Sequence, residues 1–129
     1  MSTTETPLLL LVYGENDTLI LFETICEPSK YRIVTTSTVN AALSLLSSHK
    51  IDLVIIDVMT PQFDSFNVLR TIRRYSTIPI FLLAEYNDMT TCVKSLELGA
   101  DDCIMKPFHK QEIMVRIKAK LRRANINQS

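Results

Sequence analysis

The chain has 129 residues, enough to bury the core of one domain and too few for two of ordinary size. Its 14 Lys and Arg residues balance 14 Asp and Glu residues, so the formal net charge of +0 argues against non-specific attraction to nucleic acid or membranes. No apolar run approaches the roughly 18 residues of a membrane span, and no basic segment precedes Leu8 as in a signal peptide. We therefore expect a cytoplasmic chain with a disordered N-terminus (1–7), one domain (8–123) and a tail or linker (124–129).

Five short apolar segments have the length and composition of β-strands. The first, third and fourth lack the alternation of apolar and polar residues that marks a half-exposed strand, which favours a parallel sheet covered on both faces. The predicted strands are Leu8 to Tyr13, Tyr31 to Thr35, Asp52 to Asp57, Ile78 to Ala84 and Asp102 to Met105.

Segments with apolar residues at helical spacing lie between and after these strands. The expected helices begin at Asn16 or Asp17, after Asn40, at Asp64 or Ser65 and at Asp88, and the last carries Ile113, Ile117 and Leu121. Gly99 stands where the fourth helix should end. Strands that alternate with helices predict an α/β doubly wound sandwich, because right-handed crossovers place helices on both faces of a parallel sheet.

The three cysteines, Cys26, Cys92 and Cys103, are an odd number at wide spacing. This pattern argues against a disulfide framework or a zinc site, and we interpret all three as small apolar residues. His49 and His109 are isolated from other metal-binding side chains, which favours ordinary surface positions.

Two charged residues follow predicted strands. Asp57 ends the third strand and Lys106 follows the fifth, before Pro107, where a cis peptide bond cannot be read from the sequence. In open parallel sheets, ligands bind just beyond the carboxyl ends of the strands. An aspartate or lysine alone would suit a turn or the surface, but together they indicate a site at this edge.

With these motifs the chain resembles the response-regulator receiver domains of the CheY-like superfamily, from Leu8 to Arg123. The resemblance rests on DLVIIDVMTP around Asp57, IPIFLLA, LELGADD and KPF, and is closest to OmpR/PhoB-type regulators. It implies a flavodoxin-like five-stranded sheet of order 2-1-3-4-5. It also implies a signalling role rather than an enzyme, with Asp57 accepting a phosphoryl group, Lys106 pairing with it, and the Met59 carbonyl binding Mg²⁺.

Several family positions are altered. Read without gaps, Tyr13 and Gly14 occupy the places of the two acidic residues that hold Mg²⁺, and Glu15 follows one place late. Ala84 replaces the Ser or Thr that bonds the phosphoryl group, and Cys103 replaces the aromatic switch residue. Because Mg²⁺ is usually anchored by carboxylates, these changes predict weak binding through Asp57, Met59 and Glu15 and no tightly bound cofactor.

The sequence therefore predicts an atypical receiver that does not depend on phosphorylation. The alternative is a conventional receiver, phosphorylated on Asp57 by a histidine kinase, in which Glu15 or Asp17 reaches the metal. A catalytic or cofactor-binding flavodoxin-like protein is disfavoured, since only Gly14 and Gly99 exist and no glycine-rich cradle follows the first strand.

The resemblance also implies partners. A homodimer would form through the face built from the fourth helix, fifth strand and fifth helix, and the domain could serve as a stand-alone interaction module. Its expected contacts are Lys94, Asp101, Asp102, Glu112, Ile113, Arg116 and Lys120. Transcription would require a DNA-binding domain beyond Ser129, and we expect no contact with membranes.

Overall fold

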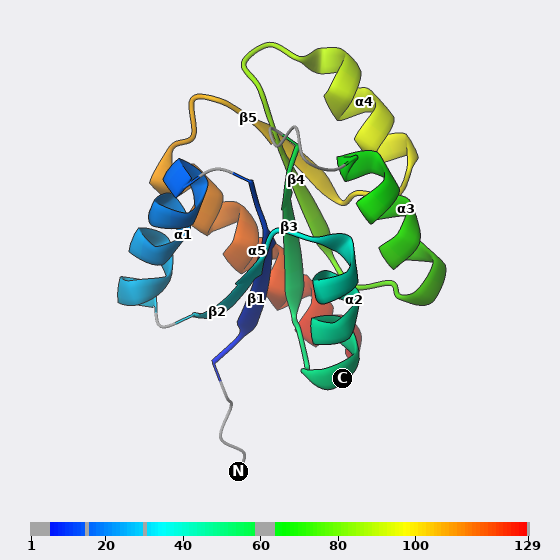
Figure 1. Cartoon of the computed structure of the whole chain (residues 1–129). Helices are drawn as coiled ribbons and strands as arrows, with labels where there is room; N and C mark the ends of the chain where they lie inside the picture. Colours follow the sequence, from blue (N-terminus) through cyan, green and yellow to red (C-terminus); the bar gives the residue numbers. More distant parts are fainter. Residues whose placement is uncertain (1–5, 15, 30, 59–63, 129) are drawn as a thin grey trace.

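The computed structural model describes residues 6–14, 16–29, 31–58 and 64–128. In these ranges five strands alternate with five helices (Figure 1). In chain order they are β1 (Leu8–Val12), α1 (Asn16–Ser29), β2 (Arg32–Thr36), α2 (Val39–Ser48), β3 (Leu53–Asp57), α3 (Ser65–Tyr75), β4 (Ile80–Ala84), α4 (Met89–Glu97), β5 (Asp102–Met105) and α5 (Lys110–Gln128). All five predicted strands are confirmed, with ends that differ by at most two residues.

The strands form one parallel sheet in the order β2-β1-β3-β4-β5, as the resemblance implied. The central strand β3 lies between β1 and β4, with Leu11 paired to Ile55 and Asp57 paired to Leu83. The carboxyl end of β3 therefore lies at the middle of one edge of the sheet, between the ends of its neighbours.

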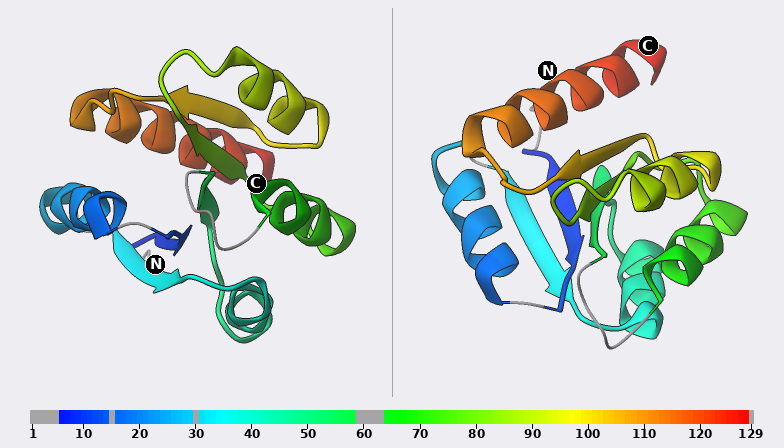
Figure 2. Two further views of the ribbon diagram at one scale, coloured as in Figure 1. Left: turned by 45° about the horizontal axis from the view of Figure 1, so that its top comes forward. Right: turned by 90° about the horizontal axis from the view of Figure 1, so that it is seen from above.

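Two layers of helices cover the sheet, as Figure 2 shows. Leu9 and Leu11 of β1 pack in the core on the side of α1 and α5, while Leu10 and Val12 pack in the core on the side of α2 and α3. Both faces of the central strands are thus buried, which explains their continuous apolar sequences. No helix in the described ranges has the combined length and apolar character that crossing a membrane requires.

Most predicted helix ends agree with the structure. Asp64 and Asp88 are N-caps, and the hydrogen bonds that Asp88 accepts from the hydroxyl and backbone N–H of Thr91 lower the pKa of its carboxyl. The second helix starts earlier than predicted, because Thr38 rather than Asn40 caps it, accepting a hydrogen bond from the Ala41 N–H at 3.2 Å.

The described chain ends are more ordered than the sequence suggested. Arg32 donates side-chain hydrogen bonds to the Thr6 carbonyl, and its backbone N–H donates to the Pro7 carbonyl at 2.9 Å. At the other end α5 reaches Gln128, so helix occupies most of the segment expected to be a tail.

Arg73 joins the end of α3 to the turn between α4 and β5. Its guanidinium donates to the carbonyls of Gly99 (2.8 Å) and Ile78 (2.6 Å) and to the Asp101 carboxylate (2.8 Å), which also accepts from the Ile80 N–H. Gly99 has φ of +114°, and a Cβ there would lie 3.0 Å from the Arg73 side chain. The glycine is therefore needed both for its backbone conformation and for space.

Replacing Arg73 with methionine should destabilise the domain by about 2 kcal/mol or more, because the partly buried carbonyls of Gly99 and Ile78 lose their charged donor and Asp101 loses one of its two cationic partners. Urea unfolding followed by circular dichroism measures the change. Arg74→Met is the matched control, since Arg74 is exposed, and should stay within about 0.5 kcal/mol of the parent. Equal losses in the two variants would contradict this role for Arg73.

Candidate functional site

Asp57 is the last residue of β3 and is completely buried. Side chains alternate along a strand, so Asp57 points to the same face as Leu53 and Ile55, the face that α1 and α5 cover. The predicted position of this carboxylate, at the carboxyl edge of the sheet, is confirmed. Its burial demands polar partners, because an isolated carboxylate is costly to remove from water.

Thr18 supplies one such partner. Its hydroxyl donates a hydrogen bond of 2.6 Å to Oδ2 of Asp57, and Thr18 itself is only 4% exposed. The sequence interpretation missed this residue. The signal was present, since Thr18 lies four residues before Phe22 and seven before Ile25, on the stripe of α1 that faces the sheet.

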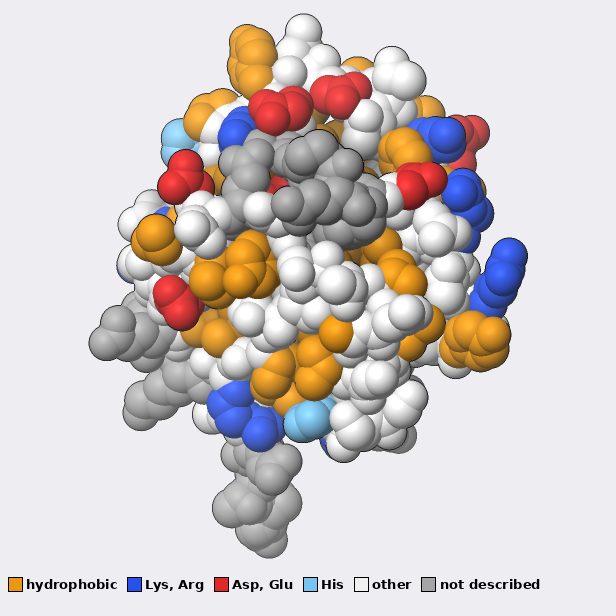
Figure 3. All heavy atoms as spheres, in the orientation of Figure 1, with side chains coloured by type: hydrophobic (Ala, Val, Ile, Leu, Met, Phe, Trp, Pro, Cys, Tyr) orange, Lys and Arg blue, Asp and Glu red, His pale blue; other side chains and the backbone are white. Residues whose placement is uncertain are grey.

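Lys106 reaches the same edge from β5. Its backbone N–H donates to the Ala84 carbonyl at 3.0 Å, and its ammonium lies 4.0 Å from the carboxylate of Glu85. The peptide bond between Lys106 and Pro107 is cis. Figure 3 shows acidic side chains at the upper end of the molecule, where the segment between β4 and α4 lies.

The positions expected to hold a metal ion are only partly described. Tyr13 follows β1, where its backbone N–H donates to the Thr36 carbonyl at 2.9 Å and its half-buried ring packs on the core beneath α1. Glu15 and Met59, two predicted metal ligands, lie outside the described residues. Among the described residues no three His, Cys, Asp or Glu side chains form a group that could hold a metal ion.

Both positions of the family's switch carry residues that cannot act in the usual way. Ala84 is fully buried at the end of β4, and its methyl group has no hydrogen to donate. Cys103 lies on β5 and forms a disulfide with Cys92 of α4, with an S–S distance of 2.06 Å. A side chain bonded in this way cannot swing between two positions.

The interpretation of the cysteines was wrong for two of the three. Cys92 and Cys103 are bonded because α4 packs on β5 and brings their Cα atoms within 5.5 Å, a proximity that their sequence spacing does not reveal. Cys26 is a buried cysteine outside this disulfide, and burial raises the pKa of its thiol to about 11. For Cys26 the prediction of a small apolar residue is confirmed.

The charged residues of the predicted dimer face pair within the chain. Arg116 lies 2.9 Å from both Asp102 and Glu112, and its hydrogen bond with Asp102 is the main cause that raises its pKa. Lys120 lies 3.0 Å from Asp101. A dimer that used these charges would have to exchange pairs that already exist.

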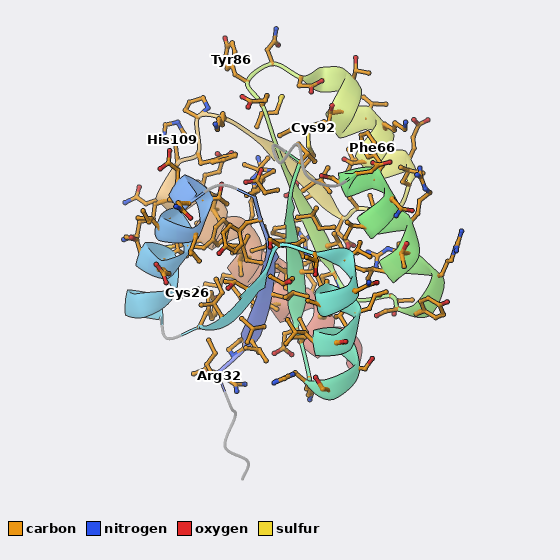
Figure 4. The ribbon with its side chains drawn as sticks, viewed as in Figure 1. Cys26, Arg32, Phe66, Tyr86, Cys92 and His109 are labelled. Atoms are coloured by element: carbon orange, nitrogen blue, oxygen red, sulfur yellow. A yellow bond between two sulfur atoms is a disulfide. The ribbon has the colours of Figure 1, made fainter. Side chains whose placement is uncertain are left out.

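Two other residues of that face have specific contacts. The ammonium of Lys94 lies 4.6 Å from the centre of the Phe66 ring, which Figure 4 labels at the start of α3. Ile113 was predicted as an apolar contact with a partner, and this is wrong. It is fully buried, because the spacing of Ile113, Ile117 and Leu121 turns all three toward the sheet.

Two solved structures share this fold. A "putative response regulator from Chloroflexus aurantiacus" and the receiver domain of TorR, the response regulator of a TMAO respiratory system, each superpose with a TM-score of 0.84 at 26% identity. Each comparison covers 91% of this chain and 98% of the other.

Several curated relatives carry the names of transcriptional regulators. "Probable transcriptional regulator ycf27" of Cyanidium caldarium is 40% identical over 115 residues, which are 89% of this chain and 46% of that protein. "Transcriptional regulatory protein AfsQ1" of Streptomyces coelicolor is 38% identical over 117 residues, or 91% of this chain and 52% of that protein. The chain thus spans about half the length of the relatives it matches.

The family model described as "Response regulator receiver domain" matches residues 9–118 of this chain. This range begins in β1 and ends within α5, so it contains the sheet except Leu8, the buried Asp57 and the Lys106 turn. Sequence, topology and fold agree, and the chain belongs to the response-regulator receiver domain family.

Proposed function

We propose that this chain is an atypical receiver domain of a cytoplasmic transcriptional response regulator, and that it signals without phosphorylation of Asp57. The observation that carries the proposal is the state of Asp57. Its carboxylate is fully buried and accepts a short hydrogen bond from Thr18, whereas a phosphodonor needs access to a carboxylate oxygen. Before phosphorylation, the Thr18–Asp57 hydrogen bond would have to break and the Asp57 carboxylate would have to become exposed.

The residues around Asp57 also supply little of the charge that phosphoryl transfer needs. Mg²⁺ bound beside the acceptor would neutralise the phosphoryl oxygens, and carboxylates normally anchor that ion. Tyr13 and Gly14 stand where the family places those carboxylates. We therefore expect Mg²⁺ affinity to be about 10–100-fold below that of a receiver with both acids, by analogy with the loss of supporting metal contacts.

The response to a phosphoryl group would be weakened as well. A ligand shifts a conformational equilibrium only through contacts that differ between the two states. Ala84 cannot donate a hydrogen bond to a phosphoryl oxygen, and Cys103 is bonded to Cys92. Neither residue would distinguish phosphorylated from unmodified Asp57.

Regulation of transcription would act through a separate DNA-binding domain. The support is that the relatives ycf27 and AfsQ1 are named as transcriptional regulators and are about twice as long as the segment shared with this chain. Under the alternative, conventional mechanism, a histidine kinase would be the partner that phosphorylates Asp57.

Self-association is a second candidate function, and the outer surface of α4 favours it. Met89, Val93 and Leu96 are exposed by 57%, 49% and 47% and lie at helical spacing on that surface. The adjacent pairs between Asp101 and Lys120 and between Asp102 and Arg116 could then be exchanged between two copies.

Incubation with acetyl phosphate and millimolar Mg²⁺ should leave Asp57 largely unmodified by mass spectrometry. The double variant Tyr13→Asp, Gly14→Asp should gain Mg²⁺-dependent modification, because it restores two carboxylates beside the acceptor. Tyr13→Asn, Gly14→Asn is the neutral control and should gain none. Stoichiometric modification of the parent chain that Asp57→Asn abolishes would contradict the atypical mechanism.

Thr18→Val should destabilise the fold by about 1.5–3 kcal/mol, because the buried Asp57 carboxylate loses the hydroxyl donor at 2.6 Å and valine has no hydrogen to donate in its place. Combining it with Asp57→Asn in a double-mutant cycle should show strong non-additivity in the free energy of unfolding. Thr24→Val is the control, since the exposed Thr24 hydroxyl bonds only locally to the Ile20 carbonyl, and it should change stability by less than about 0.5 kcal/mol. Purely additive effects at positions 18 and 57 would contradict the coupling.

If the domain dimerises through α4, Val93→Asp should abolish the dimer seen by sedimentation at micromolar concentration, since it places a charge within the apolar surface. Ile20→Asp makes the same kind of change at a residue of α1 that is 58% exposed, and should leave the dimer intact. A dimer that survives Val93→Asp would place the interface elsewhere.

A further inference from the structure

Helix α4 buries few of its side chains against the domain. Of its nine residues only Cys92 and Ser95 are buried, and the Ser95 hydroxyl is used within the helix, where it donates to the Cys92 carbonyl at 2.9 Å. A helix this short is marginal by itself, since most helical stability comes from packing of an apolar face. The contact through Cys92 is therefore central to the position of α4.

That contact is covalent. The Cys92–Cys103 disulfide joins α4 to β5 across a sequence separation of 11 residues, and Figure 4 shows Cys92 on the side of α4 that faces the sheet. If the bond is reduced, one thiol on α4 faces one thiol on β5, and Ser95 is the other buried residue of the helix. Reduction should then let α4 separate from the sheet more often.

A permanent disulfide is unexpected in the cytoplasm, where the proposed function places this chain. This step rests on the proposed function, because a regulator of transcription works where thiols are kept reduced. Disulfides found in such compartments are generally transient and serve catalysis or redox sensing. A Cys92–Cys103 disulfide that forms and breaks with redox conditions is compatible with a reducing compartment.

We propose that Cys92 and Cys103 are a reversible redox site that controls the attachment of α4 to the sheet, with low-molecular-weight thiols and disulfides as its co-reactants. In the oxidised form α4 is fixed and presents Met89, Val93 and Leu96 as one ordered surface. In the reduced form the same surface belongs to a helix that opens locally.

The chemistry is ordinary thiol–disulfide exchange. The thiolate of Cys103, the more exposed of the two, attacks a small disulfide RSSR, forming a mixed disulfide and releasing RS⁻. Cys92 then attacks the sulfur of Cys103, forming the internal bond and releasing a second RS⁻. The two protein thiols lose two electrons and two protons, and RSSR takes up both to become two RSH.

The site is connected to the strand edge that carries Asp57. Cys103 precedes Ile104, which pairs with Leu83, and Leu83 pairs in turn with Asp57. The segment that leads into α4 begins with Glu85, the ion-pair partner of Lys106. Separation of α4 from the sheet would therefore alter the surroundings of Lys106 without covalent modification of Asp57.

Cys26 offers an internal control. It lies on α1, which covers the opposite face of the sheet, and burial raises its pKa to about 11, so little of the reactive thiolate is present near neutral pH. Cys26→Ala should leave the redox response of α4 unchanged.

The first measurement counts thiols. The chain is equilibrated with oxidised and reduced glutathione at several ratios, quenched with acid, denatured and alkylated, and the products are weighed by mass spectrometry. We expect one alkylated thiol under oxidising conditions and three under reducing conditions, interconverting reversibly. Three thiols at every ratio, or bridges between chains on a non-reducing gel, would overturn the proposal.

The second measurement is hydrogen–deuterium exchange of the oxidised and reduced chain at neutral pH. Exchange in α4 should be about 10-fold faster or more after reduction, with little change in α1 and α2. Under reducing conditions Cys92→Ala and Cys103→Ala should match the α4 exchange of the reduced parent, and neither variant can form the internal disulfide at any glutathione ratio. If these variants do not fold, the comparison within the parent chain decides, and equal α4 exchange in its two forms would overturn the proposal.

Repeating both measurements in Asp57→Asn separates this inference from the proposed function. An unchanged redox response there supports a redox site independent of Asp57, whereas loss of the response would contradict it. Efficient phosphorylation of the parent chain would contradict the proposed function and leave the redox site unaffected.

Discussion

The hydrogen bond between Thr18 and Asp57 is the central contact of the candidate site. A carboxylate at the end of the central strand is costly to bury, and α1 lowers that cost by bringing a hydroxyl to 2.6 Å from its oxygen. Under the proposed function, the resting domain holds this aspartate in its unmodified form. Family membership alone would suggest a ready phosphate acceptor, whereas the local geometry favours a carboxylate that is already satisfied.

The fold could be predicted from the sequence because its signals are local and consistent. Continuous apolar runs such as Leu8 to Val12 specify strands buried on both faces, and short capping residues such as Asp64 and Asp88 mark where helices begin. The edge that holds Asp57 and Lys106 followed from parallel topology, since the ends of such strands meet on one side. Thr38 and Asn40 both suit an N-cap, so the sequence pattern could not decide which of them begins α2.

The parts that the sequence did not predict depend on which side chains meet in space. Cys92 and Cys103 looked like unrelated apolar residues until α4 was placed against β5, and Ile113 looked available to a partner until its helix was oriented. Thr18 was overlooked for a related reason, since a hydroxyl on an apolar stripe is informative only once its acceptor is known. Local pattern thus located the site, while tertiary packing determined what its residues contact.

Arg73 and Gly99 also constrain how this sequence can change. The arginine stem fills the space where a Cβ at position 99 would lie, and its guanidinium binds the carbonyl of that same glycine. A larger residue at 99 would thus face two obstacles, and shortening Arg73 would remove only the steric one, leaving the backbone at φ of +114°. Glycine should therefore be retained at position 99 as the sequence changes. Position 73 should vary only where another cation can reach the same carbonyls.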